Sequence, residues 1–538
     1  MRRRVAAIAV LCTAITISTI ARSDPQFSAE RFRAHVTFLA DDALEGREAG
    51  TRGHEIAARY VAAQFASMGL KPGGTDGTFF EQVPLSESRL AGMPEVSITT
   101  ASGTKALKQG ETAMVRGPIA GGAAHVKVPV VFAGFGITDP ASGIDDYQGI
   151  DVRGKAVALL WGAPAGIDSE IGAYLGNQKL RTAASHGAAA LIILSTPGHG
   201  IPWPLVLRYL APPATVFVQK DGTPFDEAPG LRAGAFLDPN ASAALFDGSP
   251  QTLASILEDV KKPGVRLRGF ETKATVEISV QTTTRQYTSP EVIGLIEGRD
   301  SRLRKEYVAL MAHADHIGMT SEGPDRINNG ALDNAAGVAT LLEVARAFAT
   351  SAEPPRRSIL VVANTAEEKG LVGAEYFARY PTVPIEDVAA AIDLDMPMLL
   401  YDFTDVVAYG ATHSTLEKEF RSAGAAMGIT LSPDPMPEQA VFVRSDHYPM
   451  VKAGVPAVML ATGMANGGKQ AWDRFLATNY HQPSDDLSQP IVWRAGAKFA
   501  ELNYRVVRML AEESARPRWY SKDYFGDLYA PKAKKAHR

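Results

Sequence analysis

The stretch YVALMAHADH (residues 307–316) runs from a predicted strand directly into a cluster of polar side chains. Its first half is continuously apolar, without alternation of apolar and polar positions, which is typical of a strand buried on both faces. Three later runs share this character, and they cover residues 358–363, 389–394 and 455–460. Between the runs lie amphipathic stretches typical of helices. This alternation predicts an α/β domain with a largely parallel central sheet.

Several candidate metal ligands lie just after these runs or in loops of the same domain. They are His313, Asp333, Glu368, Asp395 and His481. Each has a structural interpretation on its own, and Asp333 would equally suit a helix N-cap. Sheets of this kind, however, place ligand sites at the carboxyl ends of their strands, so the side chains can converge on one rim. Buried strands that end directly in acidic residues are costly unless bound cations compensate the charge.

Composition narrows the classes of protein that fit the chain. Its 538 residues exceed what one compact core supports, so two or three domains are expected. Hydrophobic residues make up 46% and charged residues 21%, as in ordinary globular proteins. The formal net charge is −4 and the basic residues are scattered, which argues against a nucleic-acid-binding protein. Because Cys12 is the single cysteine, any metal site must be built from histidine and carboxylate.

The first 23 residues have the three parts of a secretory signal. Arginines at positions 2–4 precede an apolar run from Val5 to Ile20, and residues 21–23 offer a small-x-small cleavage site. An uncleaved membrane anchor is the alternative, but the run is short for a hydrocarbon core of about 30 Å. We therefore expect a periplasmic or secreted protein without stable membrane insertion after cleavage.

Six motifs occur in the order and spacing of a known enzyme family. They are AHADHIG (312–318), NGALDNAAG (329–337), AEEKGLVG (366–373), LDM (394–396), RSDHYP (444–449) and YHQPSD (480–485). The early block LADDALEGR (39–47) matches as well. On these motifs the chain resembles metallopeptidase family 28, the co-catalytic di-zinc aminopeptidases related to glutamate carboxypeptidase and the transferrin receptor. The resemblance implies a three-layer zinc-exopeptidase fold with a mixed, largely parallel central sheet.

The resemblance also implies which residues hold the metals. Asp333 would bridge two Zn²⁺ ions. His313 and Asp395 would complete one site, and Glu368 and His481 would complete the other. Oxygen and imidazole ligands without thiolate suit zinc, although Co²⁺ or Mn²⁺ would also fit.

Three further residues carry catalytic roles by the same resemblance. Glu367 would be the general base, and Tyr480 would contribute to stabilising the oxyanion. Asp315 would orient His313 from the outer shell of the metal site. The peptide bond between Asp333 and Asn334 would be cis.

Other residues of the motifs have less specific interpretations. His316 and His447 are not among the family's usual ligands, so we expect structural roles for them. Arg444 would either contact a substrate group or brace its loop, and both interpretations stay open. Leu332 stands where many relatives carry an acidic residue, which affects the expected loop geometry and not the ligand set.

The middle of the chain resembles a second family. VFAGFGI (131–137), DDY (145–147), DVRGK (151–155) and RTAASHGA (181–188) look like a protease-associated domain, and short apolar runs between about 80 and 285 predict a β-rich module. In relatives this domain flanks or covers the active site. The predicted organisation is a signal peptide (1–23), an N-terminal segment of the peptidase domain (24–105), a protease-associated domain region (106–285), a di-zinc catalytic domain (286–515) and a C-terminal tail (516–538).

The predicted function is an exported metallo-aminopeptidase that removes N-terminal residues from peptides by metal-activated water. A carboxypeptidase or dipeptidase of the glutamate carboxypeptidase type is the alternative, because it uses the same metal core. A receptor-like protein with an inactive peptidase fold is a third interpretation. The presence of all five ligands and Glu367 argues against it, since inactive members lose them. No oligomeric state is predicted.

Overall fold

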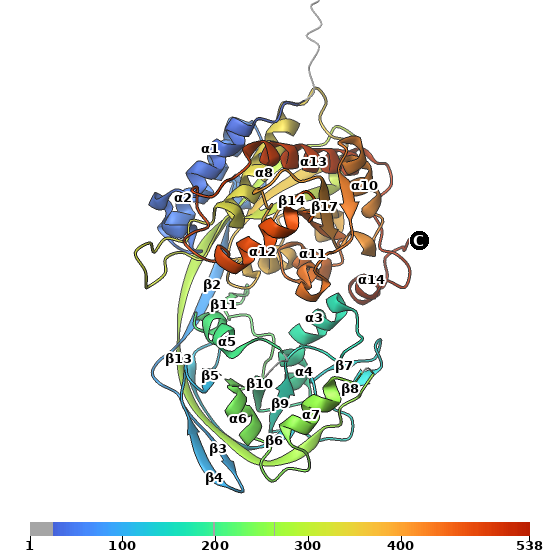
Figure 1. Ribbon diagram of the computed structural model, residues 1–538. Coiled ribbons are helices and arrows are strands. Elements are labelled where there is room, and N and C mark those ends of the chain that lie inside the picture. The colour runs from blue at the N-terminus through green and yellow to red at the C-terminus, as the bar shows by residue number, and fades with distance from the viewer. Residues whose placement is uncertain (1–24, 197–199, 263) are drawn as a thin grey trace, which may run out of the picture.

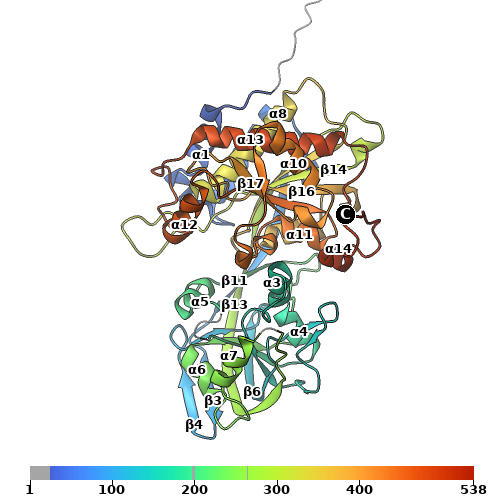
Figure 2. The ribbon, with the colours of Figure 1, turned by 45° about the vertical axis from the view of Figure 1, so that its right-hand side comes forward.

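The computed structural model describes residues 25–196, 200–262 and 264–538, and the predicted signal peptide lies outside these ranges. The described chain forms a larger and a smaller domain (Figures 1 and 2). One long strand, β13 (Phe270–Ile296), runs through both. Its C-terminal part pairs with β15 in the larger domain, and its N-terminal part pairs with β6 and β3 in the smaller one. The strand β2 (Phe80–Leu90) follows β13 through the connection.

The sheet of the larger domain has the strand order β1–β13–β15–β14–β16–β19–β17–β18. Its other strands are β1 (Lys71–Pro72), β14 (Tyr307–His313), β15 (Ser358–Asn364), β16 (Val388–Asp393), β17 (Asp405–Tyr409), β18 (Thr430–Ser432) and β19 (Ala457–Thr462). The central strands β15, β14, β16 and β19 are parallel, whereas β13 pairs antiparallel with β15 and β17 pairs antiparallel with β19. The sheet is therefore mixed and largely parallel, as the sequence predicts.

Helices cover both faces of this sheet. They are α1 (Ala29–Leu39), α2 (Arg52–Ser67), α8 (Ala336–Ala349), α9 (Val372–Arg379), α10 (Glu417–Ala426), α11 (His447–Lys452), α12 (Gly468–Thr478), α13 (Trp493–Glu512) and α14 (Tyr524–Tyr529). Helices α1, α8 and α13 pack together, with α8 and α13 against β14, while α11 packs against β16 and β19 on the other side (Figure 1). Within the described ranges, no helix combines the length and apolar character that crossing a bilayer requires.

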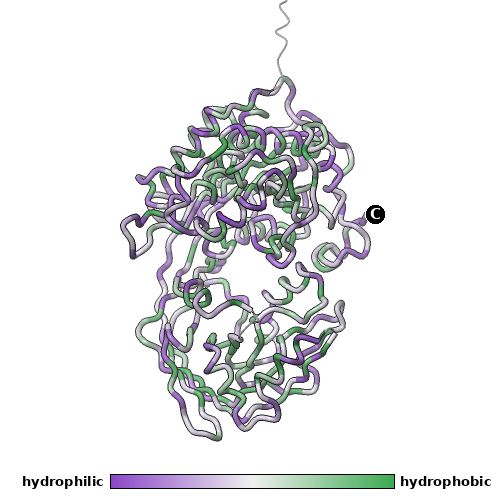
Figure 3. Tube along the Cα trace, in the orientation of Figure 1, coloured by the Kyte–Doolittle hydropathy of each residue, from purple (hydrophilic) through white to green (hydrophobic). Residues whose placement is uncertain are grey.

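Burial explains why the strands were predictable. Every residue of β15, β16 and β19 is buried, because helices lie on both faces of the sheet. The Ser28 side chain caps the first helix, α1, by accepting hydrogen bonds from the backbone N–H groups of Glu30 and Arg31. Phe32 and Val36 of this helix are fully buried in the core that it shares with α8 and α13. Figure 3 shows the apolar residues gathered along the central strands of the larger domain.

The smaller domain has its own sheet, with the order β4–β3–β13–β6–β9–β10–β12–β5. The strands of this domain are β3 (Glu95–Thr100), β4 (Gly103–Leu107), β5 (Ala113–Arg116), β6 (Gly122–Phe132), β7 (Thr138–Asp139), β8 (Ile144–Asp145), β9 (Ala156–Leu160), β10 (Ala190–Leu194), β11 (Ala214–Phe217) and β12 (Ala233–Leu237). Of these, β7 and β8 pair only with each other in the described part of the chain, and β11 pairs with β2. Its helices are α3 (Ser169–Asn177), α4 (Lys179–Ser185), α5 (Trp203–Leu210), α6 (Pro239–Ala244) and α7 (Leu253–Val260). Strands and helices together enclose a separate hydrophobic core.

This second core includes residues from before position 106. Val96 and Ile98 of β3 are buried in it, together with Leu107 at the end of β4. They join the core because β3 pairs with one edge of β13, a strand far from it in the sequence, while β6 pairs with the other edge. The sequence pattern marks the β-rich character of the region, but it does not predict this long-range pairing.

One histidine joins the two domains and the C-terminal segment. His413 Nε2 lies 2.8 Å from Glu170 Oε2 on α3 of the smaller domain, and its Nδ1 lies 2.7 Å from Asp523 Oδ2, just before α14. Burial alone would lower the pKa of His413, but its hydrogen bonds to Asp523 and Glu170 outweigh burial and raise the pKa to about 9. The protonated histidine therefore stabilises the contact between the domains.

We expect this contact to make stability depend on pH. The pKa of His413 is higher in the folded protein than the usual value near 6.5, so its stabilisation is complete below about pH 6.5 and is lost as pH rises through about 9. A shift of this size corresponds to roughly 3 kcal/mol. Denaturant unfolding at pH 6 and pH 9.5 should show a large difference between wild type and His413→Gln only at pH 6. A difference that is the same at both pH values would contradict the assignment.

Candidate metal centre

The predicted ligands converge at one edge of the large sheet, because parallel strands bring their carboxyl ends together. His313 is the last residue of β14, and Asp395 follows β16. Glu368 lies in the loop after β15. Asp333 lies in the turn that leads into α8, and His481 lies in the loop after α12. The structure therefore brings all five residues to one place.

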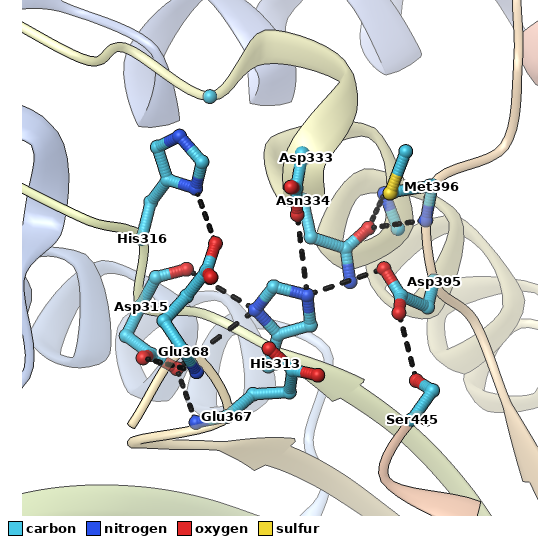
Figure 4. Close-up of polar contacts among 12 residues, drawn as sticks. His313, Asp315, His316, Asp333, Asn334, Glu367, Glu368, Asp395, Met396 and Ser445 are labelled. Carbon is cyan, nitrogen blue, oxygen red and sulfur yellow. Dashed lines mark hydrogen bonds and ion pairs between the residues drawn. The ribbon is translucent and has the colours of Figure 1, made fainter. Parts of the chain in front are cut away.

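The first group of ligand atoms surrounds His313. Its Nε2 lies 3.2 Å from Asp395 Oδ1 and 3.5 Å from Asp333 Oδ1 (Figure 4). All three side chains are buried. These nitrogen and oxygen atoms lie within 4.8 Å of one another, a spacing that would allow one cation to contact all of them.

A second group lies on the other side of Asp333. His481 Nε2 is 3.3 Å from Asp333 Oδ2 and 3.2 Å from Glu368 Oε2. Asp333 thus directs one carboxylate oxygen to each group, which is the geometry that a bridging ligand requires. The peptide bond between Asp333 and Asn334 is cis, which confirms the sequence prediction.

The donor set fits divalent cations on its own chemistry. His313 Nδ1 lies 3.2 Å from the carbonyl oxygen of Asp315, and only an N–H can donate to it. In a neutral imidazole the other nitrogen, Nε2, is then unprotonated, and it faces the carboxylates of Asp333 and Asp395. Hydrogen-bond acceptors that face one another in a buried site repel, which costs free energy, and a cation bound between them would remove this cost. Imidazole and carboxylate are ligands that zinc accepts.

Asp315 lies next to His313 and next to the turn that carries the two glutamates. Its backbone carbonyl, and not its carboxylate, is the nearer group to His313 Nδ1, since the carboxylate Oδ1 lies 3.8 Å away. The carboxylate instead accepts hydrogen bonds from the backbone N–H groups of Glu367 (3.2 Å) and Glu368 (3.4 Å). Burial raises the pKa of Asp315 to about 6. Asp315 therefore positions both the histidine and the turn that carries the two glutamates.

Glu367 is held next to the first group of ligands. Its side chain lies beside His313 in Figure 4. Burial raises the pKa of Glu367 well above its ordinary value; His313 opposes the shift, and the neighbouring Glu368 and Asp395 add to it. A carboxylate in this environment has a strengthened affinity for a proton, which a general base needs.

Tyr480 lies against the second group. Its ring stacks on that of His481, with centroids 3.9 Å apart. Burial raises the pKa of Tyr480 well above its ordinary value, and the carboxylates of Asp333 and Glu368 act in the same direction. The phenol therefore stays protonated at neutral pH and is available as a hydrogen-bond donor.

His316, for which the motif predicts a structural role, contacts the second group. Its Nδ1 lies 2.7 Å from Glu368 Oε1, and His316, Asp333 and Glu368 form a group with the spacing of metal ligands. The side chain is fully buried. The sequence gives one indication of this contact, because His316 lies in the motif AHADHIG, which also carries the predicted ligand His313.

Two residues that sequence reasoning missed hold the loop of Asp333. Asp485 accepts hydrogen bonds from the backbone N–H of Leu332 (3.1 Å) and of Asp333 (3.0 Å). Arg47 is buried and donates to the carbonyl oxygens of Asn329, at 2.6 Å, and of Gly330, at 3.1 Å. Both residues end motifs that match the family, but nothing local in the sequence identifies their partners.

The motif RSDHYP also lies close to the site. Ser445 Oγ is 2.7 Å from Asp395 Oδ2 and 2.7 Å from Asp393 Oδ2, so it braces a predicted ligand. His447 is buried with its Nδ1 3.5 Å from Asp393 Oδ2, away from the ligand groups. Arg444 is exposed, and its guanidinium lies 3.3 Å from the carbonyl oxygen of Gln439.

A cavity of about 860 Å³ lies between the domains beside the metal centre. The smaller domain lines it with Leu191, Ile193 and Phe236, and the larger domain with residues 370–372. Among the described residues, none of the five predicted ligands lines it. The cavity adjoins the centre through the loop that follows Glu368.

One segment of the chain matches a known protein family. Residues 291–507 match the profile of Peptidase family M28. A mouse (Mus musculus) protein named aminopeptidase NAALADL1 is 31% identical over 140 residues, which are 25% of this chain and 17% of the mouse protein. A vacuolar membrane protease of Pyricularia oryzae is 40% identical over 55 residues, 10% of this chain and 5% of that protein. The chain thus spans less than a fifth of these relatives' lengths.

A solved structure has the same fold over nearly the whole chain. It is an aminopeptidase from Aneurinibacillus sp. strain AM-1, with a TM-score of 0.53 and 20% identity, covering 91% of this chain and 96% of that one. The shared fold agrees with the three-layer α/β architecture described above. The match to Peptidase family M28 thus covers residues 291–507, and the shared fold extends over nearly the whole chain.

Proposed function

We propose that this protein is an exported di-zinc aminopeptidase with His313, Asp333, Glu368, Asp395 and His481 as metal ligands. One observation carries the proposal: Asp333 directs one carboxylate oxygen toward His313 and the other toward His481. The two groups of ligands therefore share a residue, as two neighbouring cations require. Two such cations would polarise a scissile carbonyl and lower the pKa of water, and this chemistry supports hydrolysis at neutral pH.

The residues around the ligands supply the proton transfers. Glu367 takes a proton from the attacking water and delivers it to the leaving amine. Its raised pKa favours the first transfer, and its contacts through Asp315 fix its backbone. The protonated Tyr480 donates a hydrogen bond to the oxyanion that develops on the carbonyl oxygen.

We extend the proposal to the smaller domain and to export. The smaller domain would be a protease-associated domain beside the active site, which its motifs and its contact with the loop of His481 support. Export rests on the signal-like residues 1–23, and the cysteine-free ligand set suits it. N-terminal sequencing of the exported protein tests this, because cleavage after Ser23 would leave Asp24 as the first residue.

Peptides blocked at one end test the direction of cleavage. We expect stepwise release of residues from a C-amidated peptide with a free α-amine, and no release from the N-acetylated peptide of the same sequence. Mass spectrometry of the products at several times gives the order of release. Cleavage of the N-acetylated peptide alone would contradict the aminopeptidase assignment and favour a carboxypeptidase.

A further inference from the structure

The helix α5 of the smaller domain is fixed at both ends. At its start, Trp203 Nε1 donates to the carbonyl oxygen of Glu111 at 2.8 Å. At its end, the guanidinium of Arg116 donates to the carbonyl oxygens of Leu210 (2.9 Å) and Pro212 (3.1 Å). The helix therefore presents its side chains from a defined position.

This helix lies beside the metal centre. Arg208 of α5 donates from Nη2 to the carbonyl oxygen of His481 at 2.9 Å. The C-terminal end of α5, at Leu210, lines the cavity between the domains together with residues 370–372, which follow Glu368. One hydrogen bond and one shared cavity thus associate α5 with the two loops that carry predicted ligands of the second group. Figures 1 and 2 show α5 on the side of the smaller domain that faces the larger one.

The face of α5 that carries Arg208 also carries two large, exposed hydrophobic side chains. Leu205, Arg208 and Tyr209 stand at positions i, i+3 and i+4, so they share one side of the helix. Leu205 is 39% exposed and Tyr209 is 53% exposed, whereas Val206 is buried in the smaller domain. Arg208 reaches the carbonyl oxygen of His481 from this side of the helix, so Leu205 and Tyr209 share the side of α5 that contacts the loop of His481.

We propose that Leu205 and Tyr209 determine specificity by contacting a large apolar side chain next to the scissile bond. The inference rests on the proposed peptidase function and adds a substrate class to it. A bound apolar side chain would remove the surfaces of both residues from water, which favours binding in proportion to the area covered. The contact is made from outside the family M28 domain, by a helix of the smaller domain.

Two matched substrate series test the inference on the full-length protein. The first compares leucine and alanine 4-nitroanilides, which vary the residue on the amino side of the cleaved bond. The second compares Ala-Leu-amide and Ala-Ala-amide, which vary the residue on its carboxyl side. For Leu205→Ala and Tyr209→Ala, we expect kcat/KM for the leucine substrate of one series to fall about tenfold, with the alanine substrate nearly unchanged.

Two control variants separate specificity from general damage. Tyr209→Phe keeps the apolar ring and should retain the wild-type ratio of leucine to alanine. Met509→Ala removes a side chain with 37% exposure from α13, on the far side of the larger domain, and should also retain it (Figure 1). Thermal unfolding of each variant checks that the fold is intact.

Each outcome decides the inference. A reduced leucine-to-alanine ratio in one series supports it and shows which side of the bond α5 contacts. An unchanged ratio in both series, or equal losses for leucine and alanine substrates, overturns it while the peptidase function stands. A wild-type protein that cleaves neither series overturns the proposed function, and this inference with it.

Discussion

Replacing Glu367 with glutamine should lower kcat by about 10²–10⁴-fold, the usual contribution of a general base. The amide keeps the size of the side chain and cannot accept the proton of the attacking water. Glu367 is not among the five proposed ligands, so the variant should bind the same amount of metal as wild type. Steady-state kinetics and metal analysis on the same preparation measure both quantities.

The chain offers a matched control for this substitution. Glu512 and Glu513 form a second pair of adjacent glutamates, at the end of α13, where Glu513 makes an ion pair with Lys418 at 3.1 Å. Glu513→Gln removes the same charge far from the site and should leave turnover unchanged. Full activity in Glu367→Gln would show that another group acts as the base.

Replacing Asp333 with alanine should remove both metals and reduce activity to background. Its two oxygens face separate groups of ligands, so the substitution takes one donor from each. Loss of a residue that merely supports a ligand weakens metal binding by about 10–100-fold, and loss of a shared ligand should exceed that at both sites. Metal content after dialysis against a weak chelator measures the effect.

Replacing Asp395, which belongs to only one group of ligands, provides the comparison for Asp333→Ala. Asp395 lies only in the group of His313, so Asp395→Ala should lose about one metal of the two and keep the other. Equal metal losses in Asp333→Ala and Asp395→Ala would contradict the bridging role of Asp333. Circular dichroism of both variants checks that the loss of metal does not follow from unfolding.

The strands that support the site were predictable because burial on both faces leaves a simple pattern. Residues 308–311 and 359–363 contain no polar position, and the structure places them in β14 and β15 at the centre of the sheet. Because these strands are parallel, their carboxyl ends lie at the same edge of the sheet. This reasoning places His313, Glu368 and Asp395 near one another without any knowledge of the family.

Contacts between distant parts of the chain were not predictable from local pattern. Arg47 binds carbonyl groups near residue 330, and His413 joins Glu170 to Asp523, although no periodicity or motif connects these positions. The resemblance to the family did not supply them either, because it assigns roles to ligands and not to the residues that hold the loops. The contact of Arg208 with His481 also joins distant parts of the chain, so local pattern does not predict it.

Asp315 and His316 show that a motif does not predict which atoms of neighbouring residues meet. The sequence places both next to His313, but backbone geometry decides which atom of Asp315 meets the imidazole, and the carbonyl lies closer than the carboxylate. His316 follows in the same loop and meets Glu368, which comes from a different strand end. Both outcomes depend on tertiary placement of side chains within an ångström or so, which a motif does not encode.

The central claim is that two metal ions, held by ligands that share Asp333, are needed for peptidase activity. Its most direct test is a titration of chelator-treated protein with Zn²⁺, followed by the rate of cleavage of an aminopeptidase substrate. We expect no activity without metal and a maximum at about two equivalents of zinc per chain. Full activity without metal, or a maximum at one equivalent with no further binding, would contradict it.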